Sequence, residues 1–139
     1  MANRPFVVDT SALLTLIEAE IGVERVEEVL RKEAILLPWP ALTEVYYISQ
    51  QESGRSEADR RFALLKQLPG RILWEADEAV ALTAARFKAE YRVSFADAMI
   101  AAFASRNEAT LLHKDPEFEV LADLVQLESL PYKNHSLGR

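Results

Sequence analysis

Short apolar runs alternate with longer amphipathic stretches along the whole of this 139-residue chain. The apolar runs predict β-strands at residues 6–8, 34–37, 71–74, 109–112 and 125–127. The amphipathic stretches predict helices at residues 11–18, 23–32, 40–51, 55–68, 77–91, 94–106 and 116–124. Strands that alternate with helices are typical of a parallel sheet covered on both faces. We therefore expect an α/β fold, a three-layer α/β/α sandwich with a mainly parallel central sheet.

The length of the chain corresponds to one domain. We expect this domain to cover residues 1–131 and a polar tail to follow at 132–139. The chain has no cysteine, which excludes disulfides, thiolate metal sites and cysteine nucleophiles. No apolar run approaches the ~18–20 residues of a membrane-spanning helix, and the first residues lack the apolar core of a signal peptide. We expect a cytoplasmic protein with no membrane partner.

Acidic residues stand where the predicted strands end. Asp9 and Asp115 come after the first and fourth strands, and Glu44 follows the second strand by a short turn. Asp97 lies in the first turn of the helix that leads into the fourth strand. The carboxyl ends of parallel strands share one edge of a sheet, where open α/β folds bind their ligands. We expect these four carboxylates to meet at that edge.

Each acid also has an explanation that needs no ligand. Asp9 can cap the helix that follows it, and Asp115 stands before a proline, which is a common helix start. Glu44 lies in the first turn of its predicted helix, where an acid complements the helix dipole. Asp97 has the spacing of a capping box with Ser94. For each acid taken singly, this structural role stays open.

Taken together, the four carboxylates point to a metal site. They would repel one another unless some took up protons or a cation bound between them. Ligands that are all oxygen suit Mg²⁺ or Mn²⁺. Such an ion activates water and stabilises charge on a phosphate, so the expected chemistry is hydrolysis of phosphodiester bonds. The formal net charge of −6 argues against a broadly basic nucleic-acid surface but leaves metal-mediated contact with phosphate open.

Four segments resemble, in order and spacing, the motifs of the PIN-domain family. They are residues 8–14 (VDTSALL), 42–47 (LTEVYY), 94–98 (SFADA) and 113–118 (HKDPEF). The length and the Glu-Val-Tyr-Tyr form are most similar to the VapC-type toxins of prokaryotic toxin–antitoxin pairs. This resemblance implies a PIN-like fold and a Mg²⁺- or Mn²⁺-dependent ribonuclease. Such toxins are usually homodimers that a cognate antitoxin holds inactive.

The resemblance also implies the residues of the active site. It assigns metal binding and catalysis to an acidic quartet of Asp9, Glu44, Asp97 and Asp115, with Ser11 as a helper. Many relatives have Thr or Ser two residues before the fourth acid, where this chain has a histidine.

Other side chains have both a functional and a structural interpretation. His113 could serve as a ligand or an acid–base group, or could be a partly buried residue beside the site. Several aromatic residues could stack on bases or pack in the core or a dimer interface: Trp39, Tyr46, Tyr47 and Trp74. A set of basic residues could bind phosphates or form a solvated helix face: Arg55, Arg60, Arg61 and Lys66.

Other classes of α/β protein fit the sequence less well. A phosphatase with Asp9 as nucleophile needs a second Asp two residues later, where this chain has Ser11, and a phosphoacceptor receiver needs paired acids. Rossmann and P-loop proteins need glycine-rich loops, and this chain has only four glycines. A PIN-like protein- or RNA-binding module with little catalysis stays the main alternative to a ribonuclease.

Overall fold

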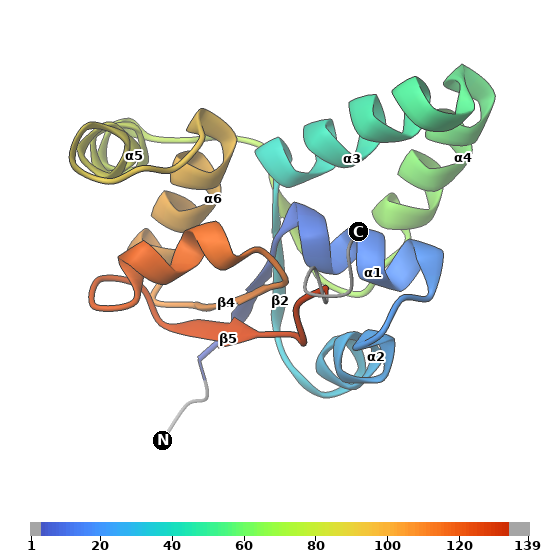
Figure 1. Cartoon of the computed structure of the whole chain (residues 1–139), viewed down its shortest axis with the longest axis horizontal. Helices are drawn as coiled ribbons and strands as arrows, with labels where there is room; N and C mark the ends of the chain where they lie inside the picture. Colours follow the sequence, from blue (N-terminus) through green and yellow to red (C-terminus); the bar gives the residue numbers. More distant parts are fainter. Residues whose placement is uncertain (1–3, 134–139) are drawn as a thin grey trace.

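A five-stranded parallel sheet forms the centre of the protein in the computed structural model, which describes residues 4–133 (Figure 1). The strands are β1 (Phe6–Val8), β2 (Ile35–Pro38), β3 (Arg71–Leu73), β4 (Thr110–His113) and β5 (Leu127–Ser129). Their order across the sheet is β3-β2-β1-β4-β5, and every pairing is parallel. The expected α/β sandwich is confirmed.

Helices cover both faces of this sheet. They are α1 (Thr10–Glu18), α2 (Val23–Lys32), α3 (Trp39–Ser53), α4 (Arg55–Lys66), α5 (Glu78–Glu90), α6 (Phe95–Arg106) and the 3₁₀ helix η1 (Pro116–Leu121). In Figure 1, α1 and α2 lie on one side of the strands and α5 and α6 on the other. The pair α3 and α4 packs together, and α3 contacts both α1 and α6.

The chain reverses its direction across the sheet next to β1. It moves outward from β1 through β2 to β3, and then returns to β4 and β5 on the other side of β1. The neighbours β1 and β4 pair with Phe6 opposite Thr110 and Val8 opposite Leu112. A crevice outside the carboxyl ends of two such strands is where open α/β sheets bind ligands. Both strands end just before an acid of the predicted quartet.

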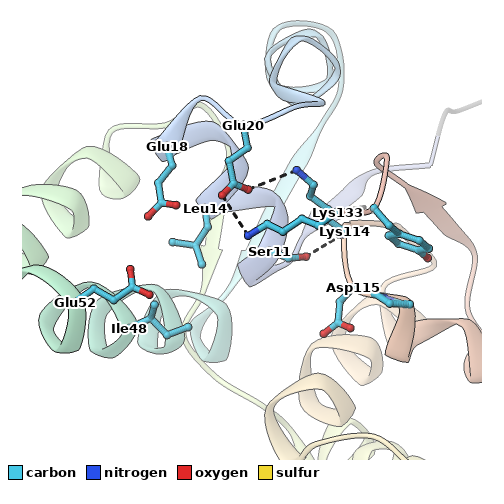
Figure 2. A pocket seen from close by; sticks show the side chains of 11 residues that line it. Ser11, Leu14, Glu18, Glu20, Ile48, Glu52, Lys114, Asp115 and Lys133 are labelled. Carbon is cyan, nitrogen blue, oxygen red and sulfur yellow. Dashed lines mark hydrogen bonds and ion pairs between the residues drawn. The ribbon is translucent and has the colours of Figure 1, made fainter. Parts of the chain in front are cut away.

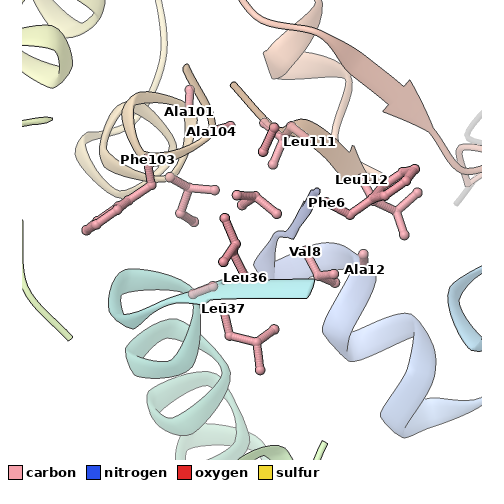
Figure 3. Close-up of a cluster of buried hydrophobic side chains, with 14 of the residues drawn as sticks. Phe6, Val8, Ala12, Leu36, Leu37, Ala101, Phe103, Ala104, Leu111 and Leu112 are labelled. Carbon is pink, nitrogen blue, oxygen red and sulfur yellow. The ribbon is translucent and has the colours of Figure 1, made fainter. Parts of the chain in front are cut away.

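The core lies on both faces of the short strands. All three residues of β1 are buried, which explains why the strand reads as a continuous apolar run. Figure 3 shows strand side chains such as Val8, Leu36 and Leu111 gathered with Phe103 of α6. The middle of α6 carries buried alanines, and small side chains let a helix approach closely. This packing holds the first turn of α6 against the carboxyl edge of the sheet.

Several element boundaries differ from the prediction. β2 extends to Pro38, which pairs with Leu73, because the last residue of a strand can lose its ladder N–H at little cost. The next helix begins at Trp39, so Glu44 lies beyond its first turn and the helix-dipole explanation for this acid is wrong. The stretch after Asp115 forms a short 3₁₀ helix rather than a helix to residue 124.

The predicted tail lies only partly within the described residues. Residues 134–139 fall outside them, so the proposed boundary of the domain stays a prediction. Tyr132 donates a hydrogen bond to Glu119 at 2.6 Å, and the ammonium of Lys133 lies 3.6 Å from the carboxylate of Glu20. These two residues therefore contact the folded domain.

Candidate metal and active site

Asp9 ends β1 and begins α1. Its backbone N–H still donates to Leu112 of β4, and its side chain accepts a hydrogen bond from the backbone of Ala12 at 2.8 Å. The residue is 1% exposed, and burial raises the pKa of its carboxyl group to about 7. Asp9 therefore caps α1, as one interpretation of the sequence predicts. Its burial also makes the charged form of its carboxyl group unfavourable.

Ser11 joins this cap to the loop after β4. Its hydroxyl lies 2.8 and 2.9 Å from the two carboxylate oxygens of Asp9, to which it donates. The same oxygen accepts the backbone N–H of Lys114 at 2.8 Å. Ser11 therefore orients Asp9 and holds the loop after β4 that carries Asp115. It is a positioning residue.

Glu44 is held at the site by two hydroxyl groups. Thr10 donates to its Oε1 at 2.5 Å, and Tyr47 donates to its Oε2 at 3.3 Å. Thr10 is buried and directly follows Asp9, so its hydrogen bond ties α3 to the start of α1. Thr10 is not among the predicted site residues, because only the topology shows that the hydroxyl after Asp9 faces the second acid.

Asp97 lies in the first turn of α6, which Ser94 caps by accepting the backbone N–H of Asp97 at 3.1 Å. The carboxylate is buried, and this burial is the main cause that raises its pKa to about 8. The rest of the rise comes from the negative charges of four nearby carboxylates: Asp115, Asp9, Glu44 and Glu117. The other members of the predicted quartet therefore all act on Asp97.

Asp115 caps η1, since its side chain accepts the backbone N–H of Glu117 at 2.9 Å. Carboxylate oxygens of Asp97, Asp115 and Glu117 lie within 4.8 Å of one another. Glu117 is not among the predicted site residues. The signal was present, because two acids stand two residues apart around the proline that opens this turn.

One hollow of about 280 Å³ brings all of these groups together, and we call it the acid hollow. Its lining contains every predicted site residue: Asp9, Ser11, Glu44, Asp97 and Asp115. Thr10, Ser94 and Glu117 line it as well, with Leu14 and Ile48 as its apolar wall. Helix capping and site membership are thus not alternatives here, because the cap positions place the carboxylates at the same edge of the sheet.

The donor set of the acid hollow fits a hard divalent cation. The crowded oxygens of Asp97, Asp115 and Glu117 are near enough to one another to share an ion, and Asp9 and Glu44 line the same space. Burial and mutual repulsion disfavour the charged forms of Asp9 and Asp97, and a bound cation would relieve both. Carboxylate and hydroxyl oxygens are ligands typical of Mg²⁺ and Mn²⁺.

His113 lies behind this site rather than in it. Its ring is 1% exposed, and its Nδ1 accepts the backbone N–H of Asp115 at 3.1 Å. The ring packs against Phe118, with 5.1 Å between centroids. Burial lowers the pKa of the imidazole, which agrees with a neutral ring whose nitrogen accepts a hydrogen bond. The histidine therefore supports the loop that carries Asp115.

Most side chains of the predicted basic cluster bind other residues of the protein. Arg60 and Arg61 both pair with Glu57, and Arg61 also reaches Glu18 at 3.2 Å. The ammonium of Lys66 lies over the ring of Phe62. These contacts favour the structural interpretation of the cluster over a phosphate-binding one.

The four aromatic residues divide between core and surface. Trp39 packs against the core, and Tyr46 donates to Asp59 at 2.7 Å while its ring meets Phe62 edge-on. Tyr47 and Trp74 are 44% and 57% exposed. Of the four, these two are the ones with a side chain exposed enough to stack on a base. Within residues 4–133, no helix is long and apolar enough to cross a membrane.

The fold is similar to that of proteins from solved toxin–antitoxin systems. The structure of VapBC2 from Rickettsia felis bound to a promoter DNA fragment matches with a TM-score of 0.73 and 14% identity, over 91% of this chain and 98% of that one. VapC20 from Mycobacterium tuberculosis, described as a Sarcin-Ricin loop cleaving toxin, matches with a TM-score of 0.71 and 18% identity, over 91% and 99%. VapBC-1 from nontypeable Haemophilus influenzae matches with a TM-score of 0.69 and 20% identity, over 89% and 96%.

The sequence itself gives the family. No curated protein matches the chain by sequence. The sequence model of the PIN domain matches residues 6–124, which run from β1 past η1 and include every residue of the acid hollow. On this match, and with the fold that the solved structures share, the chain belongs to the PIN domain family.

Proposed function

We propose that this protein is a metal-dependent endoribonuclease, the toxin of a toxin–antitoxin pair. The observation that carries the proposal is the acid hollow, in which the predicted quartet and Glu117 crowd around one space at the switch point of the sheet. Two of these carboxyl groups, on Asp9 and Asp97, have pKa values raised to about 7 and about 8. A set of acids this costly to ionise is expected where a cation binds.

The choice of RNA as substrate and of an antitoxin as partner is supported by the similar structures. VapC20 is described as cleaving the Sarcin-Ricin loop, and several of the other matches are complexes of toxin with antitoxin. Their identity to this chain is 20% or less, so they support the proposal through the shared fold alone. The cognate antitoxin is therefore part of the proposal, and the homodimer that the resemblance to VapC-type toxins implies is proposed with it.

In this proposal each residue of the site has a separate task. Asp97, Asp115 and Glu117 would hold a Mg²⁺ or Mn²⁺ ion, with Asp9 and Glu44 completing the acidic lining. The bound ion would supply an activated water and would stabilise negative charge on the phosphate. Thr10 and Tyr47 fix the orientation of Glu44. Ser11 fixes Asp9 and the loop that carries Asp115.

The test is cleavage of RNA by the purified protein, freed of any partner. Fluorogenic RNA oligonucleotides of diverse sequence are incubated with Mg²⁺ or Mn²⁺, and parallel samples receive EDTA. We expect cleavage that needs the metal and is lost in Asp9→Asn and Asp97→Asn. Cleavage that survives both substitutions would show that the wrong residues have been chosen. A folded protein that binds Mn²⁺ yet cleaves none of the RNAs would favour the binding module instead.

A further inference from the structure

A second hollow continues the acid hollow along the facing sides of α1 and α3. On α1, Ser11, Leu14 and Glu18 follow one another at helical spacing, and on α3 Ile48 and Glu52 do the same. These side chains line a space of about 300 Å³, which we call the α1–α3 groove (Figure 2). Leu14 and Ile48 also line the acid hollow, so the two spaces share a wall.

One end of the groove presents carboxylates. Figure 2 shows Glu18 of α1 and Glu52 of α3 on the side away from Asp115. Glu18 is engaged by Arg61 at 3.2 Å. Glu52 is exposed and makes no hydrogen bond or ion pair with any residue between 4 and 133. Its carboxylate is therefore a free acceptor for a ligand in the groove.

The other wall carries positive charge. Lys114 is only 5% exposed at its side chain, and its ammonium donates to the carbonyl oxygen of Ile21 at 2.8 Å. Lys114 and Lys133 both approach Glu20, at 3.5 and 3.6 Å (Figure 2). Two ammonium groups thus share the carboxylate of Glu20, and that of Lys133, whose side chain is 65% exposed, is the one open to a ligand. Tyr132 adds an aromatic ring to the same wall.

We propose that the α1–α3 groove binds the nucleotide next to the scissile phosphate and prefers guanine there, an inference that rests on the proposed ribonuclease function. The base would lie against Leu14 and Ile48, which offer an apolar surface of the kind that covers an unstacked base. Its polar edge would meet the carboxylate of Glu52, and the sugar–phosphate would run past the exposed ammonium of Lys133.

The preference for guanine follows from the free carboxylate. The Watson–Crick edge of guanine offers a ring N–H and an amino group side by side, which match the two oxygens of a carboxylate. Adenine and cytosine offer one amino group beside a ring acceptor, so they satisfy only one oxygen. Uracil places a carbonyl on each side of its N–H, and both carbonyls would be repelled by Glu52. The expected order is guanine, then adenine and cytosine, then uracil.

The experiment compares four RNA oligonucleotides that differ only in the base at the position next to the mapped cleavage site. The measured quantity is kcat/KM for each oligonucleotide with Mn²⁺, for the wild type, for Glu52→Gln and for Glu27→Gln. Glu27 is an exposed acid of α2 outside both hollows, so this control variant should keep the wild-type preference. Glu52 is exposed as well, so its substitution should leave the fold intact.

We expect Glu52→Gln to reduce the preference for guanine over uracil by at least about fivefold, since a bidentate pair is lost. A glutamine offers one acceptor and one donor, so cleavage next to uracil should improve in relative terms. Binding of the same oligonucleotides to Asp97→Asn, followed by fluorescence anisotropy, gives a second measure of base preference that does not need turnover.

The experiment distinguishes a failure of the groove proposal from a failure of the ribonuclease proposal. If the wild type cleaves RNA with the same base preference as Glu52→Gln, the groove proposal is wrong and the ribonuclease proposal stands. A second outcome is that no RNA is cleaved, but anisotropy shows that Asp97→Asn prefers guanine and that the double variant Asp97→Asn/Glu52→Gln does not. In that case the groove binds RNA and the catalytic proposal is wrong. Equal binding of all four oligonucleotides would overturn the groove proposal, and competition by an arginine-containing peptide would then assign the groove to a basic partner protein.

Discussion

The hydroxyl of Ser11 accepts the backbone N–H of Lys114 at 2.8 Å, although the two residues are 103 positions apart in the chain. Through this contact the first turn of α1 holds the loop that carries Asp115. The same hydroxyl donates to Asp9, so one small side chain links the first and the last acids of the quartet. The arrangement of the acid hollow therefore depends on a group that need not touch the substrate.

Replacing Ser11 with alanine should lower both stability and activity. The substitution leaves the backbone N–H of Lys114 without its acceptor, and an unsatisfied buried donor costs about 1–3 kcal/mol. Urea denaturation of the metal-free protein measures this loss, and the rate of RNA cleavage at saturating Mn²⁺ should fall in parallel. Ser56→Ala, at an exposed position of α4, is the matched control and should change neither value. An unchanged cleavage rate in Ser11→Ala would mean that the loop keeps its place without the contact.

Gly70 should tolerate no side chain. Its φ is +138°, and an added Cβ would lie 2.8 Å from the Cβ of Ile35 and 2.9 Å from its carbonyl oxygen. Gly70→Ala should therefore reduce the free energy of unfolding by about 2 kcal/mol or more. Gly54 has a φ of +88° and a ψ of 168° but open space around it, so Gly54→Ala should cost only the backbone strain, about 1–3 kcal/mol, and less than Gly70→Ala. Equal losses in the two variants would show that the contact with Ile35 relaxes freely.

Local pattern was enough to predict the order of the elements and the place of the quartet. Buried strands such as β1 are apolar throughout, and an acid that follows such a strand must lie at the carboxyl edge of the sheet. The contacts that orient the acids are not local. The hydrogen bond from Thr10 to Glu44 joins two elements that meet only in the folded chain, and no spacing in the sequence indicates it.

The misplaced boundaries have a similar origin. A proline usually ends a strand, but Pro38 remains in β2 because the neighbouring strand β3 still pairs with it. The spacing of Glu117 from Asp115 is visible in the sequence, but the tight turn of η1 that brings its carboxylate toward Asp97 and Asp115 is not. Tertiary contacts determine which of several similar local conformations forms, and the pattern of residues in the sequence does not show these contacts.

Replacing Glu117 with glutamine should weaken metal binding without abolishing it. The substitution removes one of three carboxylates whose oxygens lie within 4.8 Å of one another, but keeps the backbone N–H that Asp115 accepts. We expect the Mn²⁺ concentration for half-maximal cleavage to rise about 10- to 100-fold, as for other changes around metal ligands. Asp123→Asn, an exposed acid just beyond η1, should leave the titration unchanged. A wild-type titration curve for Glu117→Gln would remove this residue from the metal site.

The stability of the metal-free protein should fall as the pH rises from 7 to 9. Burial raises the pKa of Asp9 to about 7 and that of Asp97 to about 8, so the folded state holds protons that the unfolded state has already released. A folded state that binds more protons loses stability with rising pH, so the fall begins above the ordinary pKa of 3.8 and levels off once the protons of Asp97 have dissociated, above about pH 8. The loss over this range should be about 2 kcal/mol, most of it from Asp97. The buried His113 has the opposite sign, because its lowered pKa costs stability only at acidic pH.

Thermal unfolding in EDTA across this pH range measures the effect, with Asp97→Asn as the diagnostic variant. An amide cannot ionise, so this variant should lose most of the pH dependence and should be more stable than the wild type at pH 9. Asp123→Asn, which is exposed, should keep the wild-type slope. Because protons and a cation compete for the same carboxylates, Mn²⁺ should raise the melting temperature of the wild type more at pH 8 than at pH 7. A wild-type stability that stays level or rises between pH 7 and 9 would mean that Asp97 is already ionised in the metal-free fold, and that the crowding of the acid hollow does not favour a cation in the way proposed.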